Sequence, residues 1–237
     1  MDKNKLIYKI NLLLINEYGI PERAKELPDP LDLLIATILS QNTNDNNSYK
    51  AYVNLRSYIL DYSDILVMPS EKLEELIRPA GLTKQKAKAI KNIILKLKAM
   101  NNNINLEFIK SLDNNSIIEF LTDNEGIGVK TASCVLLFSL DRDVCPVDTH
   151  VHRIVNRLGI VNSKTAEGTY YKLNEKFPPK IAHSFHTNLI KHGRKICRPK
   201  NPFCGNCVLK KYCNYINKND NRTNIFSEER LLLLDKI

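Results

Sequence analysis

Four cysteines lie within one short stretch near the end of the sequence, and their spacing is typical of a metal centre. They follow the pattern Cys197-x6-Cys204-x2-Cys207-x5-Cys213. Four thiolates in one loop are enough to enclose a metal as an S4 site, and four unpaired thiols seldom gather by chance. The spacing alone leaves the metal open, because one Cys-x2-Cys also fits a structural zinc and the run matches neither common ferredoxin spacing. Cys134 and Cys145 stand singly in apolar or turn segments, which is typical of buried, inert thiols.

A second candidate site is a glycine turn followed by a lysine, in the segment Glu125-Gly-Ile-Gly-Val-Lys130-Thr-Ala. Gly126 and Gly128 permit positive φ and a close backbone approach, and the amides that begin the next helix can bind a phosphate. Such a turn alone more often only joins two helices. Lys130 adds to the pattern, because the positive end of the helix dipole favours the neutral amine, and a neutral amine is a nucleophile. The alternative role is an exposed lysine that contacts a phosphate.

Asp148 is the third candidate, in the segment PVDTHVHR. Its simplest role is to cap the helix that follows, with Thr149 competing for that position. A carboxylate held beside a lysine nucleophile would also stabilise a cationic, oxocarbenium-like sugar.

The elements that must position these residues are helical throughout, because apolar residues recur at helical spacing and no convincing alternating strand occurs. The sequence therefore predicts an all-α fold. Ser116 with Glu119 predicts a capping box, and Gly193 predicts the end of a helix. The expected helices cover residues 29–40, 84–100, 116–121, 129–140, a segment ending at Gly159, 163–177 and 181–192.

Composition narrows the class of partner. The 237 residues carry 35 Lys and Arg against 26 Asp and Glu, a formal charge of +9, which favours a nucleic acid or an anionic membrane surface. No apolar run approaches the length of a membrane span, and the first residues lack a signal-peptide pattern. We therefore expect a cytoplasmic protein with a polyanionic partner.

Taken together, GIGVKTA, VDTH and the four-cysteine loop resemble the helix-hairpin-helix DNA glycosylase superfamily, and within it the endonuclease III branch. The resemblance spans about Leu31 to Cys213. It implies two all-α lobes, with a six-helix domain at 28–143, a cluster domain formed by 1–27 and 144–217, and an extension at 218–237. It also implies that Lys130 is the Schiff-base lysine, that Asp148 is the catalytic carboxylate, and that Cys197, Cys204, Cys207 and Cys213 bind a 4Fe-4S cluster.

By the same resemblance, Asn42 and Leu82 fall where the family places residues that enter the DNA stack. Their alternative roles are a loop-capping amide and an exposed apolar residue in a turn. Glu125 stands where a proline commonly precedes the glycines, and Val129 replaces a frequent basic residue. The full set of expected DNA contacts is Gln41, Asn42, Leu82, Gly126, Gly128, Val129, His150, Lys191, Arg194, Arg198 and Lys200.

The function implied is base excision repair by a monomeric DNA glycosylase with AP lyase activity. Its substrate would be duplex DNA that carries a damaged, oxidised pyrimidine or an abasic site. The alternatives are a relative that removes mispaired thymine or uracil, one that removes adenine opposite oxidised guanine, and a zinc-stapled DNA-binding module without catalysis. Lys130 argues against relatives that lack a lysine there, and the zinc module would need neither Lys130 nor Asp148.

Overall fold

The computed structural model describes residues 2–101, 103–216 and 218, and within these ranges the chain is helical with no β-strand. This confirms the predicted all-α class. None of the helices among these residues is both long and apolar enough to cross a membrane. The α-helices are α1 (Lys3–Tyr18), α2 (Pro30–Ser40), α3 (Asp45–Tyr58), α4 (Asp64–Val67), α5 (Ser70–Leu76), α6 (Thr83–Asn101), α7 (Asn114–Thr122), α8 (Val129–Phe138), α9 (Thr149–Arg157), α10 (Ala166–Asn174) and α11 (Ala182–Lys195). The 3-10 turns are η1 (Arg78–Ala80), η2 (Glu107–Ser111), η3 (Cys204–Asn206) and η4 (Lys210–Tyr212).

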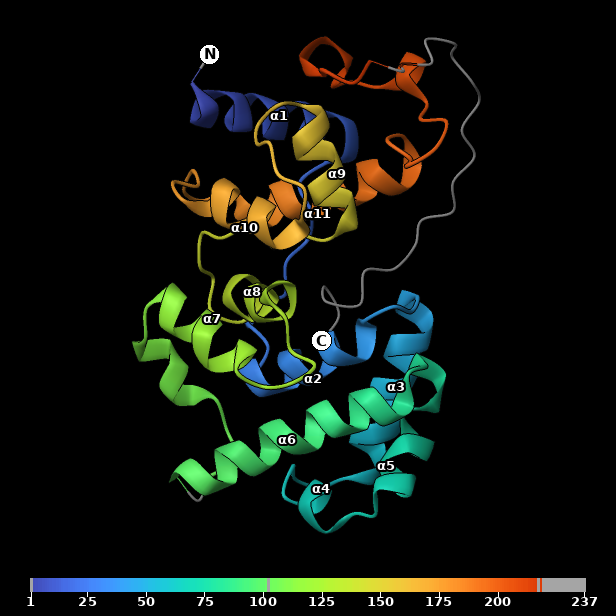
Figure 1. Ribbon diagram of the computed structural model, residues 1–237, viewed down its shortest axis with the longest axis vertical. Helices are drawn as coiled ribbons and strands as arrows, with labels where there is room; N and C mark the ends of the chain where they lie inside the picture. Colours follow the sequence, from blue (N-terminus) through green and yellow to red (C-terminus); the bar gives the residue numbers. More distant parts are fainter. Residues whose placement is uncertain (1, 102, 217, 219–237) are drawn as a thin grey trace. The chain divides into compact units, whose positions relative to one another are not determined.

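Residues 24–141 form one compact unit, called here the continuous unit, with α2 at its core. Asp29 caps α2 by accepting hydrogen bonds from the backbone N–H groups of Leu31 and Asp32, at 2.8 and 3.1 Å. Nearly every side chain of α2 is buried, because α3, α6 and α8 pack around it (Figure 1). A helix that is apolar on all sides needs such cover, as the sequence predicted for residues 29–40.

The described residues of 2–23 and 142–218 form a second compact unit, called here the discontinuous unit. Within it α1 packs against α11, although the two helices come from opposite ends of the sequence (Figure 1). Helix α9 packs against both α10 and α11. The predicted extension at 218–237 lies outside the described residues, except for Lys218.

Several predicted helix ends were wrong. The cap of α7 is Asp113, whose carboxylate accepts from the N–H groups of Asn115 and Ser116, at 2.9 and 3.1 Å, so Ser116 lies inside the helix. Helix α11 does not stop at Gly193 but continues to Lys195. A Cβ on Gly193 would lie 2.6 Å from Nδ1 of His150, so this glycine serves the packing of α9 against α11. The helices around 129–140 and 163–177 are also shorter than predicted.

Candidate active site and cysteine pocket

The turn between α7 and α8 is a tight hairpin in the continuous unit, and one of its two glycines is required by geometry. Gly126 has φ +89°, and a Cβ there would lie 2.7 Å from Cβ of Ala89 on α6. Gly128 differs from the prediction, because it has an extended backbone with φ −97° and open space around the position of a Cβ. It precedes α8 directly, where the first N–H groups have no acceptor within the helix. The hairpin therefore leaves room and donors for a phosphate oxygen.

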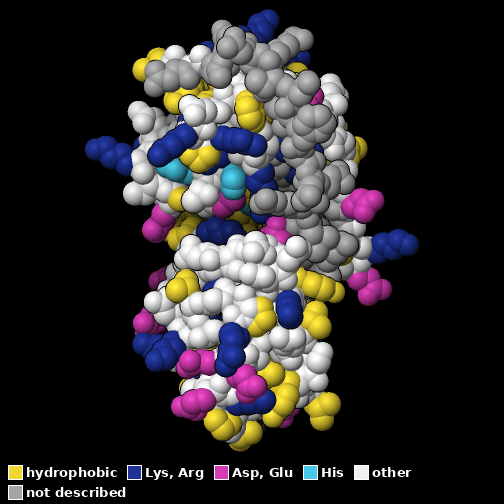
Figure 2. All heavy atoms as spheres, turned by 90° about the vertical axis from the view of Figure 1, so that its right-hand side faces the viewer, with side chains coloured by type: hydrophobic (Ala, Val, Ile, Leu, Met, Phe, Trp, Pro, Cys, Tyr) yellow, Lys and Arg dark blue, Asp and Glu magenta, His cyan; other side chains and the backbone are white. Residues whose placement is uncertain are grey.

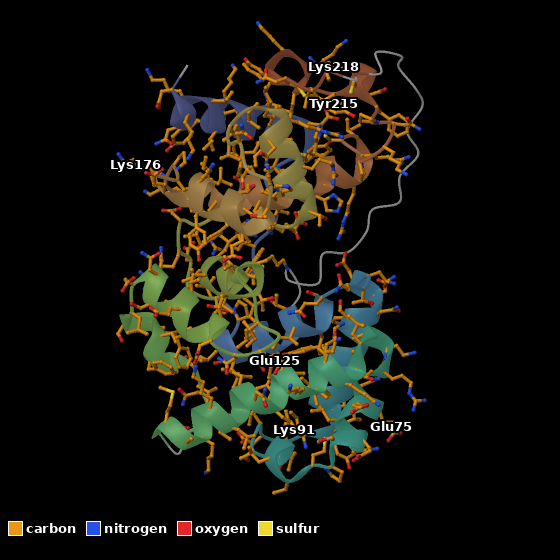
Figure 3. The ribbon with its side chains drawn as sticks, viewed as in Figure 1. Glu75, Lys91, Glu125, Lys176, Tyr215 and Lys218 are labelled. Carbon is orange, nitrogen blue, oxygen red and sulfur yellow. The ribbon has the colours of Figure 1, made fainter. Side chains whose placement is uncertain are left out.

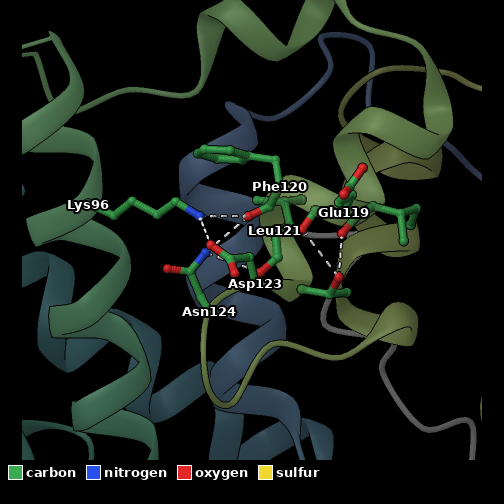
Figure 4. Close-up of polar contacts among 8 residues, drawn as sticks. Lys96, Glu119, Phe120, Leu121, Asp123 and Asn124 are labelled. Carbon is green, nitrogen blue, oxygen red and sulfur yellow. Dashed lines mark hydrogen bonds and ion pairs between the residues drawn. The ribbon is translucent and has the colours of Figure 1, made fainter.

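Side chains from α6 fix this hairpin. The Lys96 ammonium donates to the Phe120 carbonyl at 3.1 Å, pairs with Asp123 at 2.8 Å, and lies 4.3 Å from the centre of the Phe120 ring (Figure 4). Asn124 donates back to the end of α7, to the carbonyls of Phe120 and Leu121. Glu125, labelled on the turn in Figure 3, pairs with Lys88 at 2.6 Å.

Gln41 reaches from the end of α2 to the same hairpin. Its Nε2 donates to the Gly126 carbonyl at 2.9 Å and to the Thr131 hydroxyl at 3.2 Å. Gln41 was predicted as a DNA contact, and in the structure it braces the hairpin from within the continuous unit. The next residue, Asn42, is exposed and has φ +51°.

Leu82 lies in the turn between η1 and α6, and it is unusual in two respects. Its side chain is 47% exposed, and its backbone has φ +49°, a conformation that bulky residues rarely adopt. Asn42 and Leu82, the two residues predicted to enter DNA, therefore share a left-handed backbone conformation at the tip of a loop.

Lys130 is the second residue of α8, as predicted, and its side chain is half-buried. Its carbonyl accepts a hydrogen bond from the Ser133 hydroxyl at 2.9 Å. Val129, predicted as a DNA contact, opens the same helix and is also half-buried. The first turn of α8 thus presents an amine directly after the hairpin.

Asp148 caps α9 in the discontinuous unit, as the sequence predicted for its simplest role. Its Oδ1 accepts a hydrogen bond from the Val151 N–H at 2.8 Å, and the side chain is half-buried. Thr149, the competing residue, is the first residue of the helix. The cap bond occupies one carboxylate oxygen and holds the group at the positive end of α9.

His150 lies two residues beyond the cap, packed against Gly193. Its Nδ1 is 3.2 Å from a guanidinium nitrogen of Arg153, which also donates to the Gly193 carbonyl at 3.1 Å. Burial lowers the pKa of His150, Asp148 opposes that shift, and Arg153 and Arg194 add to it. Figure 2 shows histidines beside Lys and Arg side chains on one face of this unit.

The remaining predicted DNA contacts lie on α11 and on the segment that follows it. Lys191 and Arg194 are half-buried residues of α11, and Lys200 is exposed after it. Arg198 is exposed, and its guanidinium lies 4.5 Å from the centre of the Phe203 ring. These residues give the discontinuous unit a set of cations around the start of the cysteine loop.

The four predicted cysteine ligands line a single pocket. Burial raises the pKa of Cys207 to about 12, and the other three thiols are close enough to affect it. Such a donor set fits a group that takes thiolate ligands. Among the described residues no three His, Cys, Asp or Glu side chains are arranged to share one metal ion. The pocket is lined by Arg157, Ile196, Cys197, Pro202, Cys204, Cys207, Lys210, Cys213, Tyr215 and Lys218, the last two labelled in Figure 3.

Two arginines of α9 hold the cysteine loop, and neither was predicted from the sequence. Arg153 Nε donates to the Cys197 carbonyl at 2.8 Å. Arg157 donates to Cys197 Sγ at 3.3 Å and to the carbonyls of Arg198 and Pro199. The only sequence feature that could have indicated this role is their spacing of four residues, which places both arginines on the same face of one helix.

His192 of α11 was also missed. It is 1% exposed, with Nδ1 2.9 Å from the Tyr18 hydroxyl and Nε2 3.4 Å from Cys207 Sγ. Burial lowers its pKa to about 4. In contrast, Cys134 and Cys145 are fully buried, as predicted.

Comparison with known proteins identifies the family. Residues 35–179 match the HhH-GPD superfamily base excision DNA repair proteins. A putative DNA repair glycosylase of Methanocaldococcus jannaschii is 34% identical over 90% of this chain and 97% of its own length. Endonuclease III of Thermotoga maritima is 35% identical over 82% of this chain and 87% of its own.

A solved structure of a trapped covalent endonuclease III–DNA intermediate superimposes with a TM-score of 0.73. That protein is 26% identical, and the match covers 90% of this chain and 96% of the other. The chain therefore belongs to the HhH-GPD superfamily of base excision DNA repair proteins, as an endonuclease III-like DNA glycosylase.

Proposed function

We propose that this glycosylase is bifunctional and removes oxidised pyrimidines from duplex DNA through a Schiff base on Lys130, followed by β-elimination. The observation that carries the proposal is the amine in the first turn of α8, directly after a hairpin with open space at Gly128. The trapped covalent intermediate of a similar endonuclease III supports the same chemistry.

The chemistry begins once the damaged nucleotide is flipped out of the stack. The Lys130 amine attacks C1′ of the sugar, the bond from C1′ to the base breaks, and the base leaves. Asp148 stabilises the positive charge that develops on the sugar during this step. The nitrogen gives up a proton to the departing base, and its lone pair then breaks the C1′–O4′ bond while O4′ takes up a proton, which leaves a protonated Schiff base at C1′. This imine acidifies the C2′ proton, and loss of that proton expels the 3′ phosphate.

The protein contacts to DNA divide into two kinds. Gly126, Gly128 and Val129 place backbone donors on a phosphate, while Asn42 and Leu82 occupy the space that the flipped base leaves. Contacts to phosphate position the duplex and carry no sequence information, so lesion choice depends on the other residues. The proposed phosphate contacts of the discontinuous unit are His150, Lys191, Arg194, Arg198 and Lys200.

The four loop cysteines would hold a 4Fe-4S cluster, whose contribution is to order a loop with little regular structure. Arg153 and Arg157 bind the carbonyls and one sulfur of that loop, so they would orient it around the cluster. Domain boundaries at 28–143, and at 1–27 with 144–217, the monomeric state and a cytoplasmic location remain our predictions.

A relative that removes mispaired thymine or uracil is the second candidate, since one fold serves several lesions. Borohydride reduction on a panel of duplexes tests both. We expect a trapped adduct with oxidised pyrimidines and with abasic sites. A trapped adduct only with mispaired bases would favour the mismatch enzyme, and no adduct with any duplex would overturn the lyase proposal.

A further inference from the structure

Lys86 is a buried lysine in a position where the helix pattern calls for an apolar residue. It precedes the buried Ile90 by one helical turn on α6, and its side chain is only 2% exposed. A buried ammonium is costly unless its protons are donated to acceptors. Burial also lowers the pKa of Lys86 to about 8. The Lys86 ammonium therefore needs hydrogen-bond acceptors within the fold.

The Lys86 ammonium binds two backbone carbonyls from different segments. Nζ donates to the Leu39 carbonyl and to the Ala80 carbonyl, both at 2.8 Å. Leu39 lies in the last turn of α2, and Ala80 is the last residue of η1. Carbonyls at helix ends lack donors within the helix and carry partial negative charge, so one lysine caps two helix ends.

Each capped carbonyl lies just before a loop residue with a left-handed backbone. Leu39 is three residues before Asn42, and Ala80 is two residues before Leu82. The backbone N–H of Lys86 also donates a hydrogen bond to the Leu82 carbonyl, at 3.0 Å. Residues other than glycine keep such a conformation only where their surroundings enforce it. Lys86 is a bonded link between the bases of both loops.

We propose that Lys86 is a positioning residue that fixes the Asn42 and Leu82 loops in one mutual geometry, so that both side chains enter the DNA stack together. This inference rests on the proposed function. It predicts that Lys86 acts on the opening of the stack and not on the amine chemistry of Lys130.

The test compares Lys86→Met with Lys98→Met in the full-length protein. Both changes remove one lysine charge from α6, but Lys98 is exposed and lies outside the proposed DNA contacts. We expect Lys86→Met to slow single-turnover base release from a duplex with an oxidised pyrimidine by about tenfold to a hundredfold. Lys98→Met should match the unsubstituted protein. Lys86→Gln, which keeps one amide donor, should fall between them and also serves if the Met variant does not fold.

Two further measurements separate positioning from general damage to the fold. On a single strand with an abasic site there is no stack to open, so Lys86→Met should form the borohydride adduct within about twofold of the normal rate. In an Asn42→Ala/Leu82→Ala background, Lys86→Met should add less than about a twofold loss on duplex, because the effects are not additive.

Equal losses of rate on single strand and duplex, or rate losses that multiply in the Asn42→Ala/Leu82→Ala background, would overturn this inference and leave the proposed function intact. If the unsubstituted protein forms no adduct with either substrate, the proposed function fails, and this inference fails with it.

Discussion

The hairpin of the continuous unit and the cysteine loop of the discontinuous unit both contain residues with a proposed chemical role, but they are held in different ways. The hairpin joins two regular helices, and Lys96 and Gln41 fix it through backbone carbonyls and the Asp123 carboxylate. The cysteine loop contains only the short turns η3 and η4, and arginines of α9 hold it.

This difference means that the hairpin is stabilised by the protein alone, whereas the cysteine loop would depend on a bound metal group. The protein supplies the bonds of the hairpin itself, so its geometry should not depend on a bound group. The cysteine loop has four thiols around one pocket, and only a bound metal group would join these four sulfurs to one another. The predictions below test whether catalysis depends on the first region and folding of the discontinuous unit on the second.

The largest effect is expected at the hairpin, from Lys130→Gln. Glutamine keeps much of the length and the hydrogen bonding but has no nucleophilic amine. Damaged duplex should still bind, while base release and the borohydride adduct both disappear. An adduct that forms at the normal rate would mean that another amine is the nucleophile.

Asp148→Asn should lower kcat by about 10²- to 10³-fold, the loss expected when one preorganised electrostatic interaction is removed. Asparagine is as good a helix cap as aspartate, so the bond to Val151 and the stability of the fold should remain. Asp148→Ala removes both cap and charge and should cost about 1 kcal/mol of stability in addition. If activity in both variants falls only in proportion to stability, Asp148 is a cap and nothing more.

Cys204→Ala tests the cysteine loop. The unsubstituted protein should be yellow-brown, with about four irons per chain, and the variant should lose iron, solubility and DNA affinity together. Cys134→Ala is the matched control, because Cys134 is buried in α8 and should keep the full iron content. Stoichiometric zinc and no visible absorption, in protein made with ample iron, would contradict a 4Fe-4S cluster.

The sequence could predict features that depend on neighbours along the chain. The start of α8 before Lys130 and the cap at Asp148 follow from short local patterns, and both are confirmed. A glycine and a lysine at the start of a helix, or an acidic residue just before a helix, make the same local interactions in many folds. The all-α class follows similarly from helical spacing.

Features set by contacts between distant elements could not be predicted. Gly193 is typical of a helix end, but it lies inside α11 because His150 of another helix packs against it. Lys86 is one lysine among many on α6, and only the fold shows that its ammonium reaches two helix ends. The contact of His192 with Cys207 likewise depends on how the loop returns to α11.

Lys191→Glu should have a moderate effect on DNA binding. If Lys191 binds a phosphate, affinity for all sequences should fall alike, and the slope of log affinity against log salt should decrease by about 0.9 for each phosphate that is no longer neutralised. Lys9→Glu, an exposed change on α1, is the control with the same change of charge. An unchanged slope for Lys191→Glu, measured by titration at several salt concentrations, would place Lys191 outside the interface.

The smallest effect is expected from His150→Gln, on the pH dependence of stability. Burial lowers the pKa of His150 in the folded protein, so between that pKa and the ordinary value of 6.5 the unfolded chain binds more protons. The free energy of unfolding should therefore decrease as the pH falls below about 6.5, and His150→Gln should reduce that decrease. Urea midpoints at about pH 7.5 and about pH 5.5 measure the difference between the two proteins. Equal decreases in both would mean that His150 takes up its proton as readily in the folded protein as in the unfolded chain, and that its packing against Gly193 does not keep the imidazole neutral.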